Sequence, residues 1–222
     1  MRALPRGVVF DMDGTLLDTE RLARACFEQA CRDVGWEPDL PLYDQCVGTT
    51  HEATEALLRQ GYGPAFPYTD FQARWSQHYN AHVQHRPVDL KPGITELLSE
   101  LAGRGIPLCI ATSSRRPAVE VKLRLAELTH FFDFYVCGGE AAAGKPHPAP
   151  YLHAVERLGF TPAECWAVED SDNGVRSAVA AGLQVFQIPD LLAPGPAMRD
   201  LGHQLLPDAH ALVDTLVGLD PR

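Results

Sequence analysis

Two aspartates separated by a single residue, Asp11 and Asp13, have the types and spacing best suited to chemistry in this sequence. They follow the apolar run Val8-Val9-Phe10, which has no polar position and therefore favours a strand buried on both faces of a parallel sheet. Because side chains alternate along a strand, we expect both carboxylates on one side of the chain, at the carboxyl end where open α/β sheets hold ligands. Two carboxylates placed there can divide nucleophilic and acid/base work between them.

An ordinary turn is the plain alternative for this stretch, because Asp and Gly are common where strands end. Gly14 in particular allows a sharp backbone turn. With average residue frequencies, however, a fixed Asp-x-Asp-Gly-Thr pattern is expected in only about one in 10³ chains of this length. That rarity, together with the mechanistic sense of the spacing, favours a functional site.

The run from Asp11 to Thr19 reads Asp-Met-Asp-Gly-Thr-Leu-Leu-Asp-Thr and resembles the first motif of the haloacid dehalogenase superfamily, in its branch of small phosphatases and β-phosphoglucomutase-like enzymes. Later segments resemble the remaining motifs in the family's order, so the resemblance covers nearly the whole chain. It implies a Rossmann-like α/β core, a helical cap and a Mg²⁺ cofactor. The joint match is specific for the superfamily and not for a substrate.

The resemblance also implies where Mg²⁺ would bind. Its protein ligands would be the Asp11 carboxylate, the Asp13 main-chain carbonyl and a downstream acid, here Asp170, with Glu169 beside it as a further metal ligand. Oxygen donors next to a phosphate are the surroundings that Mg²⁺ prefers. Taken alone, an acid before a helix more often serves as a cap, so the assignment of this pair depends on the first motif.

Further segments resemble the family's phosphate-binding elements. Thr112, at the end of an apolar run, matches a phosphate-binding hydroxyl, with Ser113 next to it. Lys145, in Gly-Lys-Pro-His-Pro ahead of a helical stretch, matches the lysine that pairs with the nucleophile and the phosphate. Gly14 and Asp11 are expected to bind the phosphate together with these residues. By itself Thr-Ser-Ser is an ordinary helix start, in which Ser114 would cap the helix.

These residues support a hypothesis of phosphate monoester hydrolysis through an aspartyl-phosphate. Asp11 attacks phosphorus, while Asp13 donates a proton to the leaving oxygen and later takes one from the attacking water. We expect Lys145 and Thr112 to assist by holding the phosphate. The two carboxylates then need different surroundings, with Asp11 kept ionised beside cations and Asp13 partly desolvated.

The elements that position these residues follow from hydrophobic periodicity. Apolar runs predict five strands, and helical stripes separate the later ones, which is the pattern of a doubly wound parallel sheet. The strands are predicted near residues 8–10, 106–111, 132–137, 165–168 and 183–188. The helix after the second strand is expected to bury a stripe of Val121, Leu125 and Leu128.

A helical module interrupts this alternation directly after the first strand. Three helical stripes and no strand pattern occupy residues 20–86, with Pro-rich and Gly-rich connectors at Pro38 and Pro41 and at 61–64. Residues 87–93 read as the return linker. We therefore predict an α/β core of residues 1–17 and 88–222 and an α-helical cap of residues 18–87, which lies over the site as a lid and selects the substrate.

Composition limits the partners and the compartment. The 222 residues carry a net charge of −10, which argues against nucleic acid or an anionic membrane as partner. There is no run long and apolar enough to span a bilayer, and the start lacks the apolar stretch of a signal peptide, so a cytoplasmic location is expected. The six cysteines show no Cys-x-x-Cys pair and are expected to be reduced core residues. The expected partner is a small phosphorylated substrate, bound by a monomer or weak homodimer.

Several alternatives stay open at this point. A mutase is disfavoured because Ala23 stands where the resemblance leads one to expect His at the cap entry, and His51 where an Arg would hold a second phosphate. A dehalogenase is disfavoured because it would need neither Asp13 nor Asp170. A silent protein that binds a metabolite through its cap would need no such set of residues. The substrate itself, whether a sugar phosphate, phosphoglycolate or a nucleotide-derived monoester, is not predicted.

Three cap histidines form a second pattern. His78, His82 and His85 share one face of a predicted helix, at a spacing that can chelate a transition metal. No neighbouring Cys or acid completes a ligand set, so packing or a position facing the cleft is the favoured interpretation.

Overall fold

The computed structural model describes residues 4–49 and 51–219, so the outermost residues of the predicted core, 1–3 and 220–222, and Thr50 in the cap lie outside it. The described chain contains a parallel sheet of six strands in the order β3-β2-β1-β4-β5-β6. The strands are β1 (Gly7–Phe10), β2 (Leu108–Ala111), β3 (Phe134–Val136), β4 (Cys165–Glu169), β5 (Gln184–Gln187) and β6 (Gln204–Leu205). The first five confirm the prediction, and β6 is too short to give a sequence pattern.

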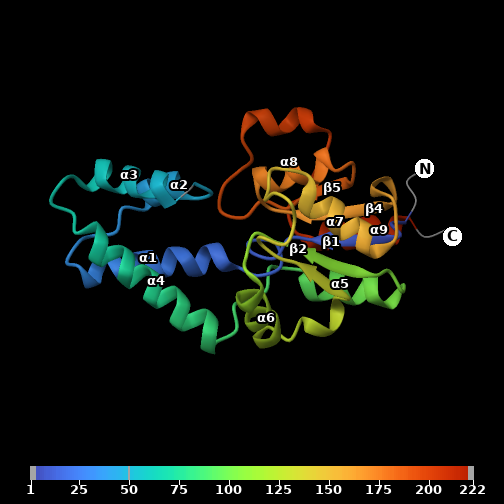
Figure 1. Ribbon diagram of the computed structural model, residues 1–222, viewed down its shortest axis with the longest axis horizontal. Coiled ribbons are helices and arrows are strands. Elements are labelled where there is room, and N and C mark those ends of the chain that lie inside the picture. The colour runs from blue at the N-terminus through green and yellow to red at the C-terminus, as the bar shows by residue number, and fades with distance from the viewer. Residues whose placement is uncertain (1–3, 50, 220–222) are drawn as a thin grey trace.

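The central strands β1, β2 and β4 are buried along their whole length, as the uniformly apolar sequence of β1 predicted for that strand. In β1, Val8 and Phe10 pack on one face and Val9 on the other, because side chains alternate. The first face is covered by α5 (Ile94–Gly103), α6 (Arg116–Leu125) and α9 (Ala209–Gly218), and the second by α7 (Ala149–Leu158) and α8 (Asp172–Ala180). This is a doubly wound, Rossmann-like α/β core (Figure 1).

Four helices lie apart from this sheet and form the predicted α-helical cap (Figure 1). They are α1 (Thr19–Asp33), α2 (Leu40–Cys46), α3 (His51–Tyr62) and α4 (Tyr68–His85). Their buried residues make a hydrophobic cluster of their own, in which the ring of Phe27 contacts those of Tyr43, Phe71 and Trp75 at centroid distances of 4.9, 5.4 and 5.5 Å. The cap therefore carries its own small core.

The cap is inserted directly after β1 and returns beside its own starting point. Leu17 forms an antiparallel bridge with Leu90, and the Asp18 amide donates to the Asp89 carbonyl at 2.8 Å. The two chain crossings between cap and core thus lie side by side. Residues 87–93 connect α4 to α5, as predicted for the return linker.

Two local expectations were wrong. Helix α2 occupies part of what was read as a connector; Pro41 sits in its first turn, where no amide hydrogen bond is lost, and Asp39 caps it by accepting from the Leu42 amide at 3.0 Å. In α6 the buried positions are Val119, Lys122 and Leu123, so the helix is rotated relative to the predicted stripe of Val121 and Leu125, although Leu128 beyond its end is buried as expected.

The structure also contains short 3₁₀ helices at Thr129–Phe131, Pro162–Glu164 and Pro196–Leu201. All six cysteines are free and buried, which confirms that they are reduced core residues. Among the described helices, none has the length and apolar character needed to cross a membrane.

The cap cluster generates a first prediction. Phe27→Ala removes a fully buried ring that three other aromatic rings contact, so the free energy of unfolding should fall by about 3–5 kcal/mol in urea denaturation. Val217→Ala, at an exposed position of α9, should change it by less than about 0.5 kcal/mol. A loss no larger for Phe27→Ala than for this control would contradict the proposed packing.

Candidate active site

Lys145 lies at the centre of the site, between two carboxylates. Its Nζ donates to Asp11 Oδ1 at 2.6 Å and to Glu169 Oε1 at 2.5 Å. The side chains of Lys145, Asp11 and Glu169 are 6%, 10% and 0% exposed, so the two ion pairs are shielded from water. Asp11 directly follows β1, and its amide donates to the Val168 carbonyl of β4 at 2.9 Å, which brings the ends of the two strands together.

Glu169 is the last residue of β4 and points to the same face as Cys165 and Ala167, where α7 and α8 pack. Both of its oxygens are occupied. Besides Lys145, Oε1 accepts from the Tyr151 hydroxyl at 2.8 Å, while Oε2 accepts from the amides of Asp170 and Ser171 and from the Ser171 hydroxyl. This set of donors favours a role in holding Lys145.

A glycine on α8 makes room for the Glu169 carboxylate. A Cβ atom on Gly174 would lie 1.8 Å from Glu169 Oε1, which no side chain can tolerate. Gly14 has the same relation to Asp170, because a Cβ there would lie 2.4 Å from Asp170 Oδ2, and its φ of +83° also favours glycine. The hydroxyl of Thr15 donates to Asp170 Oδ1 at 2.7 Å. Gly14 therefore permits the close approach between the first motif and the Asp170 carboxylate.

Asp11, Glu169 and Asp170 form the one group of three or more potential metal ligands in the part of the chain that the structure describes, with ligand atoms within 4.8 Å of one another. One ammonium, that of Lys145, faces these three carboxylates. Among the described residues no hydrogen bond reaches Oδ2 of Asp11 or of Asp170. Two oxygens and an excess of negative charge fit a hard divalent cation such as Mg²⁺.

The charges in this group shift its pKa values in a consistent direction. Burial, with further repulsion from Glu169, raises the pKa of Asp11 to about 7 despite the opposing effect of Lys145. Burial and the charges of Glu169 and Asp11 raise the pKa of Asp170 well above its usual range. For Lys145 burial alone would lower the pKa, but the two carboxylates outweigh it and the pKa is raised. Lys145 is therefore cationic, and the carboxylates lack positive charge.

Asp13 sits in different surroundings. The strand ends at Phe10, so the alternation that predicted a common side for the two aspartates does not extend to Asp13. Its Oδ1 accepts from Lys122 Nζ and its Oδ2 from the Ser114 hydroxyl, both at 2.6 Å. Lys122 belongs to α6, on the sheet face opposite to the helices around Glu169. The two carboxylates are thus held from opposite faces of the sheet.

Asp13 was expected to be partly desolvated; its side chain is 25% exposed, and that of Asp11 is more buried at 10%. A second expectation near this pair was wrong. Ser114 was expected to cap α6, but Arg115 occupies the cap position without a side-chain cap bond, and the Ser114 hydroxyl turns to Asp13. The hydroxyl is better used there because an ionised acceptor gives the stronger hydrogen bond.

Thr112, Ser113 and Lys145, which the sequence assigned to phosphate binding, line a common cavity of about 210 Å³. Thr112 follows β2 and is buried; its Oγ1 accepts from the Ser114 amide at 3.0 Å. Arg115 lines the same cavity, whereas Arg116 pairs with Glu140 at 2.6 Å. The hydroxyls and two cations of this cavity are suited to an anion next to Asp11.

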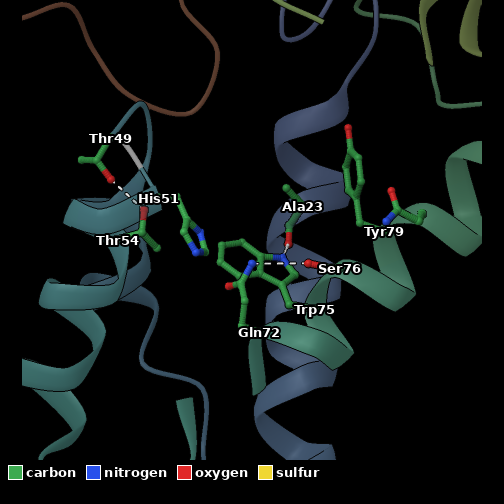
Figure 2. A pocket seen from close by; sticks show the side chains of 9 residues that line it. Ala23, Thr49, His51, Thr54, Gln72, Trp75, Ser76 and Tyr79 are labelled. Atoms are coloured by element: carbon green, nitrogen blue, oxygen red, sulfur yellow. Dashed lines mark hydrogen bonds between the residues drawn. The ribbon is translucent and has the colours of Figure 1, made fainter. Parts of the chain in front are cut away.

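The cap contains a separate pocket of about 340 Å³ (Figure 2). Figure 2 shows Thr49, His51 and Thr54 on one side of it and Trp75, Ser76 and Tyr79 on the other. The described residues that line it include hydrogen-bonding and aromatic side chains but no Asp, Glu, Lys or Arg; they are Ala23, Thr49, His51, Thr54, Gln72, Trp75, Ser76, Tyr79 and Asn80. Its walls therefore suit a neutral, polar or planar group.

The cap histidines do not form a metal site among the described residues. His78 Nε2 lies 2.7 Å from Asp33 Oδ2, and His82 Nε2 lies 3.2 Å from the Pro87 carbonyl. His85 joins no group of potential metal ligands in this part of the chain. Surface pairing accounts for His78 and a backbone contact for His82.

Lys122, Tyr151 and Gly174 are the site residues that sequence reasoning missed. Lys122 left no usable signal, because the predicted stripe of Val121, Leu125 and Leu128 indicated another buried face, and only the observed face includes Lys122. Tyr151 and Gly174 read as ordinary helix residues. Their roles depend on what lies opposite them in the fold.

The carboxylate group generates a second prediction. Excess Mg²⁺, compared with EDTA, should raise the thermal unfolding temperature; saturation at 100 times the dissociation constant adds about 2.7 kcal/mol. The cation must displace protons from carboxylates whose pKa values are raised, that of Asp11 to about 7, so the stabilisation should be small at pH 6 and grow toward pH 8. Asp170→Asn should lose the shift, and Asp33→Asn, in the cap, should keep it. An equal shift at both pH values, or none, would contradict this site.

Known proteins provide an independent comparison. A probable pseudouridine-5′-phosphatase from Drosophila melanogaster is 36% identical over 188 residues, covering 82% of this chain and 80% of the relative. Protein CbbY from Cereibacter sphaeroides is 33% identical over 225 residues and covers 96% of both chains. The crystal structure of a haloacid dehalogenase family hydrolase from Deinococcus radiodurans, with bound phosphate and sodium, has a TM-score of 0.82 at 27% identity and covers 98% of this chain and 97% of its own.

The match extends beyond single relatives to a family as a whole. The haloacid dehalogenase-like hydrolases match residues 8–188, which span β1, the cap and the sheet as far as the end of β5. This range includes every residue of the group around Lys145. The chain belongs to the family of haloacid dehalogenase-like hydrolases.

Proposed function

We propose that this protein is a phosphatase that hydrolyses a small phosphorylated metabolite with Mg²⁺ and an aspartyl-phosphate intermediate. One observation carries the proposal: Lys145 joins Asp11 to Glu169 beside Asp170, while Asp13 stands free of that group with partners of its own. The proposed nucleophile, Asp11, and the proposed acid/base group, Asp13, thereby lie apart and have different charged partners. Relatives named as phosphatases of pseudouridine 5′-phosphate, phosphorylated carbohydrates and phosphoglycolate support the same reaction class.

Asp11 is the nucleophile in this scheme. Its carboxylate attacks phosphorus and the bond from phosphorus to the leaving oxygen breaks. Lys145 holds the carboxylate in place at 2.6 Å and, with Thr112 and Ser113 on the shared cavity, binds the phosphate oxygens. Gly14 keeps the backbone close to Asp170. Asp11, Asp170 and the Asp13 carbonyl, with Glu169 next to them, would hold Mg²⁺, which would supply the positive charge that this carboxylate group lacks.

Asp13 moves the proton. It donates to the leaving oxygen as the phosphorus bond breaks, and takes a proton from the water that then cleaves the aspartyl-phosphate. Its hydrogen bonds to Lys122 and Ser114 place it on the side of the site that faces α6 and the cap. Protein side chains thus account for each proton in the two half-reactions.

The cap, residues 18–87 in our proposal, selects the leaving group, and the core, residues 1–17 and 88–222, carries the chemistry. Tyr79 connects the two, because it lines the cap pocket and its hydroxyl lies 3.2 Å from Lys122, which binds Asp13. The pocket has hydrogen-bonding walls without a charged Asp, Glu, Lys or Arg among its described residues. The substrate class we propose is a monophosphate ester of a neutral, polar alcohol.

A mutase is less well supported by this pocket. His51 and Ala23, which stand where the resemblance leads one to expect Arg and His, both line it. No described residue there offers the bidentate guanidinium that a second phosphate would require. A dehalogenase or a silent metabolite-binding protein leaves the ordered contacts of Asp13 and Lys145 without a purpose.

Other properties stay predictions from the sequence. They are a cytoplasmic location, a monomeric or weakly dimeric state, and the lack of nucleic-acid and membrane partners. The net charge of −10 supports the last of these.

The catalytic assignment generates a third prediction. With p-nitrophenyl phosphate and Mg²⁺, Asp11→Asn should abolish turnover, since an amide cannot form the acyl-phosphate. Asp13→Asn should lower kcat by roughly 10²–10⁴ because both half-reactions lose their proton carrier. Asp214→Asn, at an exposed position of α9, should retain the normal rate. A near-normal rate in Asp13→Asn would remove the acid/base assignment, and no activity above Asp11→Asn in the wild type would count against a phosphatase.

The pocket generates a fourth prediction. Fructose 1-phosphate should be hydrolysed with a kcat/KM at least about tenfold above that of fructose 1,6-bisphosphate, because a second phosphate would be desolvated without a charged partner. His51→Arg should narrow that ratio, and His130→Arg, outside the cap, should leave it unchanged. Equal kcat/KM values for the two esters in the wild type would show that the pocket does not discriminate by charge.

A further inference from the structure

Lys122 is an unusual residue for its place in the fold. It lies on the buried face of α6 between Val119 and Leu123, and its side chain is 4% exposed. Burial alone would lower the pKa of this ammonium, but the carboxylate of Asp13 outweighs that effect and the pKa is raised. Lys122 is therefore a buried cation, and the groups that it contacts stabilise its charged form.

Those partners come from both parts of the molecule. Lys122 Nζ donates to Asp13 Oδ1 at 2.6 Å and to the Tyr79 hydroxyl of cap helix α4 at 3.2 Å. The same ammonium lies 5.6 Å from the centroid of the Tyr79 ring. An ammonium has three N–H donors, so one donor remains after these two bonds. Lys122 thus forms a polar contact between the acid/base carboxylate and the cap.

Asp13 has both oxygens engaged in this arrangement. Oδ1 accepts from Lys122 and Oδ2 from the Ser114 hydroxyl. Each oxygen can accept a second hydrogen bond, but the bonds to Lys122 and Ser114 fix the orientation of the carboxylate, so turning it toward a leaving oxygen requires one of these bonds to lengthen. Lys122 donates both to Asp13 and to Tyr79 of the cap. A ligand in the cap can therefore affect the hydrogen bond between Lys122 and Asp13.

The other end of this contact lines the cap pocket. Tyr79 stands on the pocket wall with Ser76 and Asn80, and Figure 2 shows its ring on the side opposite His51. A group bound between these walls touches the residue that orients Lys122. Two side chains, Tyr79 and Lys122, therefore connect the cap pocket to the Asp13 carboxylate.

We propose that Lys122 is a positioning residue that couples occupancy of the cap pocket to the placement of Asp13. With the pocket empty, Lys122 holds Asp13 with both oxygens occupied. A leaving group that fills the pocket and carries an accepting oxygen beside the ester draws the Lys122 ammonium toward itself and Tyr79, which frees Asp13 Oδ1 for the ester oxygen. The proposal rests on the proposed phosphatase function and assigns its leaving group as one with a hydroxyl or carbonyl oxygen near the ester.

The kinetic test uses the full chain with Mg²⁺ and fructose 1-phosphate. Lys122→Met keeps the aliphatic stem but loses the ammonium, and should lower kcat 10–100-fold with KM within about threefold, a part of the general acid/base effect. Lys122→Arg should recover at least a third of the wild-type kcat. Arg124→Met, at an exposed position of the same helix, serves as the matched control and should stay within twofold of wild type. A raised KM at unchanged kcat would make Lys122 a simple binding residue, and unchanged values of both would make it structural; either overturns the proposal.

A second measurement does not depend on turnover. In Asp11→Asn protein, fructose 1-phosphate should shift the ¹³C carboxyl resonance of Asp13, and Tyr79→Phe in the same background should lose at least half of that shift. An Asp13 resonance that ignores the ligand, or that shifts equally without the Tyr79 hydroxyl, overturns the coupling. Failure of wild-type turnover alone would instead count against the phosphatase function, so the two ideas fail in different experiments.

Discussion

The structure depends on a buried lysine held between two carboxylates. At a separation of about 2.6 Å and an effective dielectric constant near 20, each ion pair of Lys145 is worth on the order of 6 kcal/mol of Coulomb energy before desolvation is counted. Removing the lysine would leave carboxylates buried without a partner, which is among the costliest changes in a protein interior. With three carboxylates and one ammonium the group still lacks positive charge. That deficit explains why the site is suited to a cation and, through the cation, to an anionic substrate.

The sheet topology creates this charge group. With the strand order β3-β2-β1-β4-β5-β6, the ends of β1, β2 and β4 are neighbours, and Asp11, Thr112 and Glu169 stand at those ends. Alternation in β4 then turns Glu169 toward α7 and α8, where Tyr151 donates to it and Gly174 leaves it space. The position of Asp11 is therefore set by strand register more than by its own loop.

The cap and the core meet at the second aspartate. The cap has its own aromatic cluster and contacts the chemistry through the Tyr79 hydroxyl and Lys122, while its two chain crossings run side by side at Leu17 and Leu90. A body with its own core and paired crossings can move as a unit relative to the sheet. Asp13 is hydrogen-bonded to Lys122, which contacts Tyr79 of the cap, whereas the Asp11 amide is hydrogen-bonded to the neighbouring strand β4.

Sequence alone determined the class of fold, the five longer strands, the inserted helical cap and the order of the motifs around Asp11 and Lys145. These rest on local patterns, namely apolar runs, helical periods and short motifs, that do not require a partner elsewhere in the chain. The tertiary structure decided what binds Asp13, since Ser114 and Lys122 are 101 and 109 residues away from it along the chain. It also decided that Asp11, rather than Asp13, is the more buried carboxylate. Burial and charge pairing are properties of what packs opposite a residue, and a rotation of α6 by a fraction of a turn was enough to hide Lys122 from a periodicity argument.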